Sequence, residues 1–350
     1  MKIDDIAKIA KVSKSAVSLA LNGKPGISPE TRERIIGIVR EAGYIPRPLI
    51  KADQVYGLGQ AIRFLVIADS DIVMEHYYKR PFFAELIHFV EERCRARGYS
   101  LLFSAVDIHN YEQDLRALGE ENGNHGMILL GTNLNRRQIE AIARIQPRLV
   151  VLDHYSDVLP VDFVVMNNAM GAYQAAAYLA RQGHRRIGYV QSHLRMYNFD
   201  SRKLGLFQAS EELDMEVSSA DIFTMSTAKL TSQDGFQQRL LARIERSEPP
   251  PTALFCENDY LAISAVKSLH GIGIRVPDDI SVIGFDNISE SFIVTPELTT
   301  IHVDKERMAH QAVDQLIHLI EREDRVSMKT IVDTRLIERK SCRNLTGTPD

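Results

Sequence analysis

IDDIAKIAKVSKSAVS, residues 3–18, decides the fold of the N-terminal region. Apolar residues recur at helical spacing in its first half, and Asp4 and Asp5 favour the positive end of a helix dipole. Ser13 is the expected N-cap of a second helix over residues 14–21. The stretch therefore predicts two short helices joined by a tight turn.

A third helix is predicted after the stop signal NGKPG at residues 22–26. Ser28 is its expected N-cap, Pro29 occupies the first helical position, and Gly43 ends it. The inward-facing positions of the three helices are expected to include Ala10, Val17 and Ile35. Three such helices suit a helix-turn-helix module that reads DNA, or else a three-helix packing or dimerisation unit.

The charge is unevenly distributed along the 350 residues. Residues 1–60 hold ten Lys and Arg against six Asp and Glu, so this segment carries +4 and the remainder −8. A basic head on an acidic body indicates nucleic-acid contact by the head alone.

Four motifs of the head carry a resemblance to a known family. Residues 3–18, LNGK at 21–24, ISPETRER at 27–34 and GYIP at 43–46 resemble the DNA-binding head of LacI/GalR-type transcription regulators. The resemblance implies a helix-turn-helix head at residues 1–46 whose second helix reads bases. It also implies that the base readers are Lys14, Ser15 and Leu19, and that the phosphate or backbone contacts are Ser13, Ser18, Asn22 and Tyr44.

Residues 47–60 are expected to form a hinge or linker. In the family this segment pushes a leucine into the minor groove, which unstacks a base step and kinks the duplex. Here the usual position holds Asp53. Either Leu49 or Ile50 takes that role, or the segment is a flexible tether.

From residue 61 onward, short β-branched runs alternate with helical patterns. The expected strands are 64–68, 101–106, 127–130, 149–152, 163–166, 187–190, 253–256, 281–285 and 300–303. The expected helices are 82–97, 110–121, 135–145, 169–182, 201–213, 235–246, 258–270 and 304–323. This alternation predicts parallel sheets, and the length exceeds one comfortable core, so two α/β lobes are expected.

Ligands of such sheets bind beyond the carboxyl ends of the strands. Those ends are rich in Asp and Asn, which suit hydroxyl groups, and Phe82 and Phe83 offer an aromatic wall. Together they indicate a sugar-like recognition set. For each Asp or Asn alone, a helix cap or turn former is the competing interpretation.

Three motifs extend the resemblance over nearly the whole chain. GHRRIGY at 183–189, VPDDISVIGFDN at 276–287 and TPELTTI at 295–301 resemble the effector-binding core of the same family, which is similar to periplasmic sugar-binding proteins. The resemblance implies two doubly wound lobes joined by three crossings, one lobe from 61–163 and 292–325 and the other from 164–291 and 326–342. The effector-binding residues it implies, with the aromatic pair, are Phe82, Phe83, Asp153, Arg202, Asn258 and Asp286. A structural salt bridge between Arg202 and Asp286 is the alternative for that pair.

No sequence feature favours an enzyme. The three cysteines form no CxxC pair, and HExxH, GxSxG and P-loop motifs are absent, so no metal, cofactor or catalytic residue is expected. The acidic start after Met1 and the lack of an apolar run of ~20 residues predict a cytoplasmic protein.

The sequence thus predicts a DNA-binding transcription regulator, a repressor that acts as a homodimer on a near-palindromic operator. Its operator affinity is expected to respond to a small effector, a sugar or sugar derivative, bound between the lobes. The dimer surface is expected on the helix after Pro81 and on the helix over 258–270. The rival interpretations are an exported solute-binding protein and a sugar-modifying enzyme.

Overall fold

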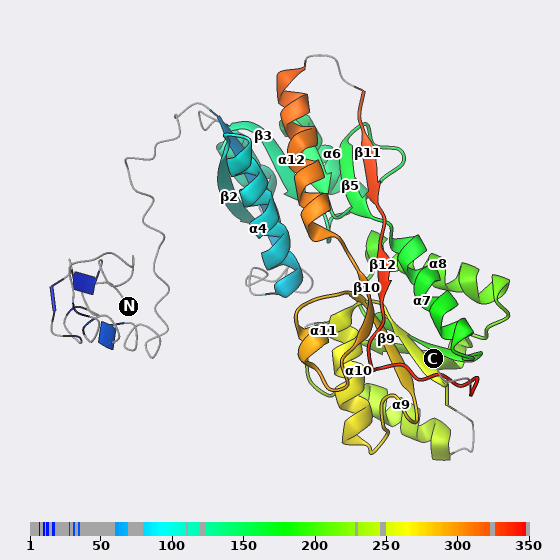
Figure 1. Cartoon of the computed structure of the whole chain (residues 1–350). Coiled ribbons are helices and arrows are strands. Elements are labelled where there is room, and N and C mark those ends of the chain that lie inside the picture. The colour runs from blue at the N-terminus through cyan, green and yellow to red at the C-terminus, as the bar shows by residue number, and fades with distance from the viewer. Residues whose placement is uncertain are drawn as a thin grey trace. The chain divides into compact units, whose positions relative to one another are not determined.

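In the computed structural model the chain forms two compact units, Met1–Tyr56 and Gly57–Asp350, which are described separately. The residues that the structure describes are 7, 10, 12, 13, 16, 17, 28, 31, 34, 35, 60–68, 80–109, 111–119, 124–227, 230–245, 250–322 and 326–347. Figure 1 shows the core, residues 57–350, as two lobes with one sheet each.

In the head, the described residues agree with the predicted helices. The inward positions Ala10, Val17 and Ile35 are helical and buried. Ser13 Oγ accepts a hydrogen bond from Ala16 N at 3.1 Å, and Ser28 Oγ accepts one from Thr31 N at 3.2 Å. Both predicted N-caps are therefore confirmed.

The N-terminal lobe is a six-stranded parallel sheet in the order β11-β5-β4-β3-β1-β2. Its strands are β1 (Ala61–Ala68), β2 (Ser100–Asp107), β3 (Asn124–Leu130), β4 (Leu149–Leu152), β5 (Asp162–Met166) and β11 (Lys329–Val332). Its helices are α4 (Pro81–Ala96), α5 (Tyr111–Gly119), α6 (Arg136–Ile145) and α12 (Lys305–Glu321). Alternate residues of β1 face opposite ways, so Phe64 joins the core under α4 and α12 while Leu65 joins the core under α5 and α6.

The C-terminal lobe repeats this plan in the order β12-β10-β9-β8-β6-β7, with only β12 antiparallel. Its strands are β6 (Ile187–Ser192), β7 (Ile222–Met225), β8 (Ala253–Cys256), β9 (Ser281–Asp286), β10 (Thr299–His302) and β12 (Arg335–Ile337). Its helices are α7 (Asn168–Arg181), α8 (Tyr197–Glu212), the 3-10 turn η2 (Ser219–Asp221), α9 (Asp234–Glu245), α10 (Asp259–Gly271) and α11 (Glu290–Ile293). Helices α7 and α8 pack against each other on one face of the sheet, and α9 and α10 cover the other.

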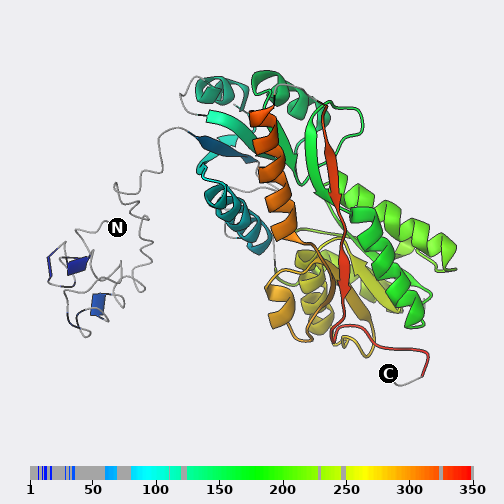
Figure 2. The same cartoon turned by 45° about the horizontal axis from the view of Figure 1, so that its top comes forward.

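The chain crosses between the sheets three times, as expected, but at other residues. The crossings follow β5, β10 and β11, whereas the predicted lobe boundaries lay after residues 163, 291 and 325. Strand β10 pairs with β9 and so belongs to the C-terminal lobe, and β11 pairs with β5 and so belongs to the N-terminal lobe. Figure 2 shows the last segment running from one lobe into the other.

The predicted strands and helices of the core are all present, with ends shifted by up to four residues. The sequence did not indicate β7, β11, β12 or α11, each only three or four residues long. Within the part of the chain that the structure describes, no helix is both long and apolar enough to cross a membrane.

Candidate functional site

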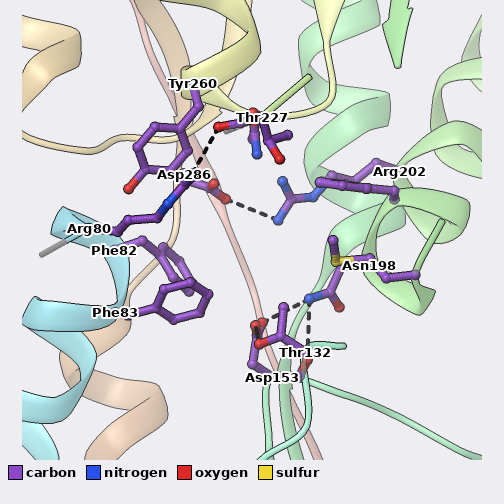
Figure 3. Close-up of a pocket in the computed structure, with 13 residues that line it drawn as sticks. Arg80, Phe82, Phe83, Thr132, Asp153, Asn198, Arg202, Thr227, Tyr260 and Asp286 are labelled. Carbon is purple, nitrogen blue, oxygen red and sulfur yellow. Dashed lines mark hydrogen bonds and ion pairs between the residues drawn. The ribbon is translucent and has the colours of Figure 1, made fainter. Parts of the chain in front are cut away.

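A pocket, partly open to solvent, lies between the two lobes at the carboxyl ends of their strands. Figure 3 shows its side chains converging from both lobes. All six residues predicted to bind effector line it. The full lining is Arg80, Phe82, Phe83, Thr132, Asp153, Met196, Asn198, Phe199, Arg202, Thr227, Asn258, Tyr260 and Asp286.

The aromatic wall stands at the start of α4. Pro81 occupies the first turn, where its missing N–H costs nothing, and the chain then turns Phe82 and Phe83 into the pocket. Their rings meet edge to face with centroids 5.5 Å apart. Tyr260 and Phe199 supply aromatic surface from the C-terminal lobe. The pocket therefore offers ring faces from both lobes.

Arg202 and Asp286 form an ion pair at the floor of the pocket, with Nη2 and Oδ1 3.0 Å apart. The guanidinium also donates to Asn168 Oδ1 at 2.8 Å and to the Glu257 carbonyl at 2.6 Å, and its carbon lies 3.7 Å from the Phe285 ring centroid. The salt bridge considered from the sequence is thus present. Burial raises the pKa of Asp286, and the nearby Arg202 opposes that rise.

Gly205, three residues after Arg202, explains how this arginine reaches its partners. A Cβ built on Gly205 would lie 2.0 Å from the Ala169 carbonyl oxygen. Only glycine allows α8 to approach α7 this closely. The close approach places Arg202 beside Asn168 at the start of α7.

Asp153 and Asn198 connect the two lobes across the pocket. Asp153 follows β4, and its Oδ1 accepts from Asn198 Nδ2 at 2.8 Å while its other oxygen accepts from the Thr132 hydroxyl. Asn198, on α8, accepts in turn from Asn168 Nδ2 at 2.9 Å. Burial raises the pKa of Asp153 to about 6. The Asp153 carboxyl thus links the N-terminal lobe to the C-terminal lobe through the neutral amide of Asn198.

Asn258 is a helix cap, and its contact with effector stays a prediction. Its Oδ1 caps α10 by accepting from Leu261 N at 2.9 Å. Its Nδ2 has no hydrogen-bond partner in the described part of the chain and lies at the pocket lining. The cap thus leaves a donor for a ligand.

Sequence reasoning missed several lining residues, chief among them Arg80. Its Nη2 donates to the Thr227 carbonyl across the cleft at 3.1 Å, and its guanidinium lies 4.8 Å from the Tyr260 ring centroid. No motif marks Arg80, Thr132, Asn198 or Thr227, because segments far apart in the sequence bring them together. Among the described residues, no cluster of three or more potential metal ligands occurs.

Of the residues predicted to contact DNA, only Ser13 lies within the described part of the head, where it is exposed and caps its helix. The other residues predicted to contact DNA lie outside it: Lys14, Ser15, Ser18, Leu19, Asn22, Tyr44 and Leu49.

Comparison with known proteins agrees with this architecture. The chain is 30% identical over 351 residues to the HTH-type transcriptional repressor PurR of Mannheimia succiniciproducens, covering 98% of this chain and 99% of the relative. The PurR of Aliivibrio salmonicida is also 30% identical, with the same coverage. Residues 2–47 match the bacterial regulatory proteins of the lacI family, and residues 176–342 match the periplasmic binding protein-like domain. The chain belongs to the lacI family of bacterial regulatory proteins. This confirms the predicted family and the predicted DNA-binding transcription regulator, and it excludes both rival interpretations.

Solved structures share the fold. The lac repressor dimer bound to operator and the anti-inducer ONPF aligns with a TM-score of 0.68 at 21% identity, covering 98% of this chain and 99% of that one. A complex of the regulator CelR with cellobiose gives 0.68 at 21% identity, covering 97% and 99%. The predicted helix-turn-helix head and two-lobed α/β core are confirmed.

Proposed function

We propose that this lacI-family regulator is a cytoplasmic repressor that binds a near-palindromic operator as a homodimer and responds to a small polyhydroxylated effector, a sugar or sugar derivative. The observation that carries the effector part is the convergence of six residues, chosen from five separate segments of sequence, in one pocket between the lobes.

The pocket chemistry supports a polyhydroxylated ligand. Asp153, Asp286 and Asn258 present carboxylate and amide groups that suit hydroxyls, and Phe82 and Phe83 present aromatic surface to an apolar ring face. The CelR chain of the same fold is solved with cellobiose, which is consistent with this class.

The head is the proposed DNA-binding element. Lys14, Ser15 and Leu19 are assigned to base edges in the major groove. Ser13, Ser18, Asn22 and Tyr44 are assigned to the phosphate backbone, which positions the helix. Leu49 is assigned to the minor-groove wedge, with a plain tether as its alternative.

Exposed apolar side chains on one side of the core support the homodimer. Leu102 and Phe103 are exposed on the edge strand β2, and Phe292 and Ile293 on α11 are 65% and 75% exposed. Figure 1 shows β2, α4 and α11 along the same side. Helix α10, expected in this surface, is almost wholly buried within the C-terminal lobe, so α11 replaces it in the proposal.

Effector and operator binding are coupled through the lobes in this proposal. A change in lobe closure alters the placement of the two N-terminal lobes and their heads in a dimer. Such coupling is typically ~1–3 kcal/mol and reciprocal, so operator must change effector affinity by the same factor.

The operator part is tested by selecting bound duplexes from a random DNA pool with the full-length protein at one stated salt concentration. A near-palindromic motif is the expected result. Failure to enrich any motif, with and without added cell metabolites, would overturn it.

The division of labour is tested with two variants. Lys14→Ala is expected to weaken operator binding while effector-induced thermal stabilisation stays intact. Asn258→Ala is expected to weaken the effector response with operator affinity nearly kept. Equal loss of both activities in both variants would refute the assignment of the two sites.

A further inference from the structure

The pocket contains two arginines whose surroundings differ. Arg202 is 3% exposed and has protein partners on all three of its nitrogens, including the carboxylate of Asp286. Arg80 is half-buried, and in the described part of the chain no carboxylate pairs with it. Its one hydrogen-bond acceptor is the neutral Thr227 carbonyl. A guanidinium carries five N–H donors, so Arg80 has donors left for a ligand.

A second donor group lies beside Arg80. Tyr260 is 5% exposed, and among the described residues its hydroxyl has no hydrogen-bond partner of normal geometry, although it lies close to the Phe82 amide. The Arg80 guanidinium lies over the ring of the same tyrosine. Figure 3 shows Arg80 and Tyr260 side by side at one corner of the pocket, above Phe82 and Phe83.

The start of α4 adds to the positive character of this corner. No side chain caps this sixteen-residue helix, and its first turn holds no acidic residue. The N-terminal end of a helix carries a partial positive charge and free N–H groups that favour anions. This end of α4 carries Phe82 and Phe83, so it borders the same pocket.

The rest of the pocket has the opposite character. Asp153 and Asp286 bring carboxylate oxygens, and Thr132 lies hydrogen-bonded to the first of them. These groups suit ligand hydroxyls and would repel an anion placed beside them. A ligand that satisfies both parts carries hydroxyls that face the carboxylates and one anionic group that faces Arg80.

We infer that the effector is a monosaccharide-sized polyol with one anionic group, a carboxylate or a phosphate, bound by Arg80 and the Tyr260 hydroxyl. A planar carboxylate or a phosphate pairs with the guanidinium through two parallel hydrogen bonds. Binding of that group holds Arg80, which comes from the N-terminal lobe, against Thr227 and Tyr260 of the C-terminal lobe. This inference rests on the effector role proposed for the pocket.

The test uses matched ligands that differ only in the anionic group. Full-length protein is titrated by calorimetry with a stereochemically varied panel of aldohexoses, the corresponding hexuronates and the hexose 6-phosphates. The expected result is an anionic sugar that binds at least tenfold more tightly than its neutral parent. Tight binding of a hexuronate would identify the anionic group as a carboxylate, and tight binding of a hexose 6-phosphate would identify it as a phosphate.

Arg80→Gln removes the charge but keeps a donor for the Thr227 carbonyl. The variant is expected to lose the tenfold preference for the anionic ligand, and its melting temperature shows whether it is folded. Arg144→Gln, an exposed arginine on α6 paired with Glu140, is the matched control and should keep the preference.

Each other outcome overturns the inference in a recognisable way. Equal affinity for neutral and anionic partners refutes the anionic group but retains a sugar effector. A preference that survives Arg80→Gln refutes the role of Arg80. Binding of no panel member, or of nucleobases instead, refutes the sugar acid, while operator selection reports separately on the regulator.

Discussion

The two walls of the pocket are built differently. The C-terminal wall is a connected network in which Arg202 joins Asn168, Glu257 and Asp286 through its three nitrogens. The N-terminal wall presents Arg80 and two phenylalanines, and within the described part of the chain Arg80 makes one hydrogen bond. The C-terminal wall is held by contacts within its own lobe. The position of Arg80 in the N-terminal wall depends instead on Thr227 and Tyr260 of the other lobe. We therefore expect substitutions in the Arg202 network to change stability and those at Arg80 to change ligand response.

The largest effect is expected at the buried ion pair of the C-terminal wall. Asp286→Ala should lower the free energy of unfolding by about 3–5 kcal/mol, because it leaves the Arg202 guanidinium buried without a carboxylate. Arg202→Met should be less costly at low pH, because Asp286, whose pKa burial already raises, can take up a proton, whereas arginine cannot lose one.

The measurement is urea unfolding of both variants and the parent at pH 5 and pH 8. The deficit of Arg202→Met relative to the parent should shrink at pH 5, and that of Asp286→Ala should not. Arg144→Met, in an exposed pair of the N-terminal lobe, should stay within about 0.5 kcal/mol of the parent. Equal deficits at both pH values for the two buried sites would contradict this account.

The next effect is expected where α7 and α8 meet behind the same wall. Gly205→Ala places a methyl group against the Ala169 backbone, which cannot move like a flexible side chain, and should cost about 1–3 kcal/mol. Gly235→Ala in α9 is the control, because nothing lies within 4 Å of its Cβ position. It should be neutral or stabilise by up to about 1 kcal/mol. Thermal unfolding of both variants measures the two changes in stability. An unchanged stability in Gly205→Ala would refute the close approach of α8 to α7.

Sequence could predict the local patterns of the molecule but not the contacts between distant segments. The strand and helix patterns were readable because each arises from local spacing, and the caps at Ser13, Asn258 and Ser28 were readable for the same reason. The choice of Arg202 came from the family resemblance, and only the structure shows that Gly205 lets its helix approach Ala169 closely.

The misplaced lobe crossing and the missed pocket residues both depend on contacts between segments far apart in the sequence. Strand β10 is four residues long, and nothing within it indicates which sheet it joins, so the second crossing was misplaced. Arg80 precedes a proline and belongs to no motif. Its role in the pocket depends on contacts with Thr227 and Tyr260, more than 140 residues later. Sequence therefore predicted lining residues of both walls, and it missed residues such as Arg80 and Thr227 whose roles depend on contacts across the cleft.

Acid–base behaviour should also differ between the walls. Burial raises the pKa of Asp259, beneath the C-terminal wall, to about 8, and that of Asp153, in the N-terminal wall, to about 6. Both values exceed the unfolded value of 3.8, so the folded state binds more protons and stability falls as pH rises toward each value. Buried His154, with its pKa lowered to about 4, has the opposite slope below about pH 6.5.

The window from pH 6.5 to 8 lies above the pKa values of Asp153 and His154 and extends to that of Asp259. Stability of the parent should fall across it by at most about 2 kcal/mol, since one unit of pKa shift corresponds to about 1.4 kcal/mol. Asp259→Asn should flatten this part of the profile, while Asp153→Asn should leave it unchanged. Melting temperatures at four pH values measure the slope, and an unaltered slope in Asp259→Asn would exclude this carboxyl as its source.

The smallest effect on stability is expected at the bond between the walls. Asn198→Ala removes the donor to Asp153 Oδ1 and carbonyl O, at 2.8 and 3.2 Å, and should cost only about 1 kcal/mol, because both partners regain water when the lobes part. The closed arrangement should nevertheless become less populated, and effector affinity should fall in proportion to the closed fraction.

Spin labels at the exposed positions Arg137 and Glu211, one on each lobe, would report the distance between the lobes without effector. Asn198→Ala should broaden and lengthen that distance distribution. Gln191→Ala, which removes a bond to Thr224 inside the C-terminal lobe, should not. An unchanged distribution in Asn198→Ala would mean that other contacts between the lobes, Arg80–Thr227 among them, keep the lobes together. Combining Asn198→Ala with Arg80→Ala, which removes the donor to Thr227, should then lengthen the distance.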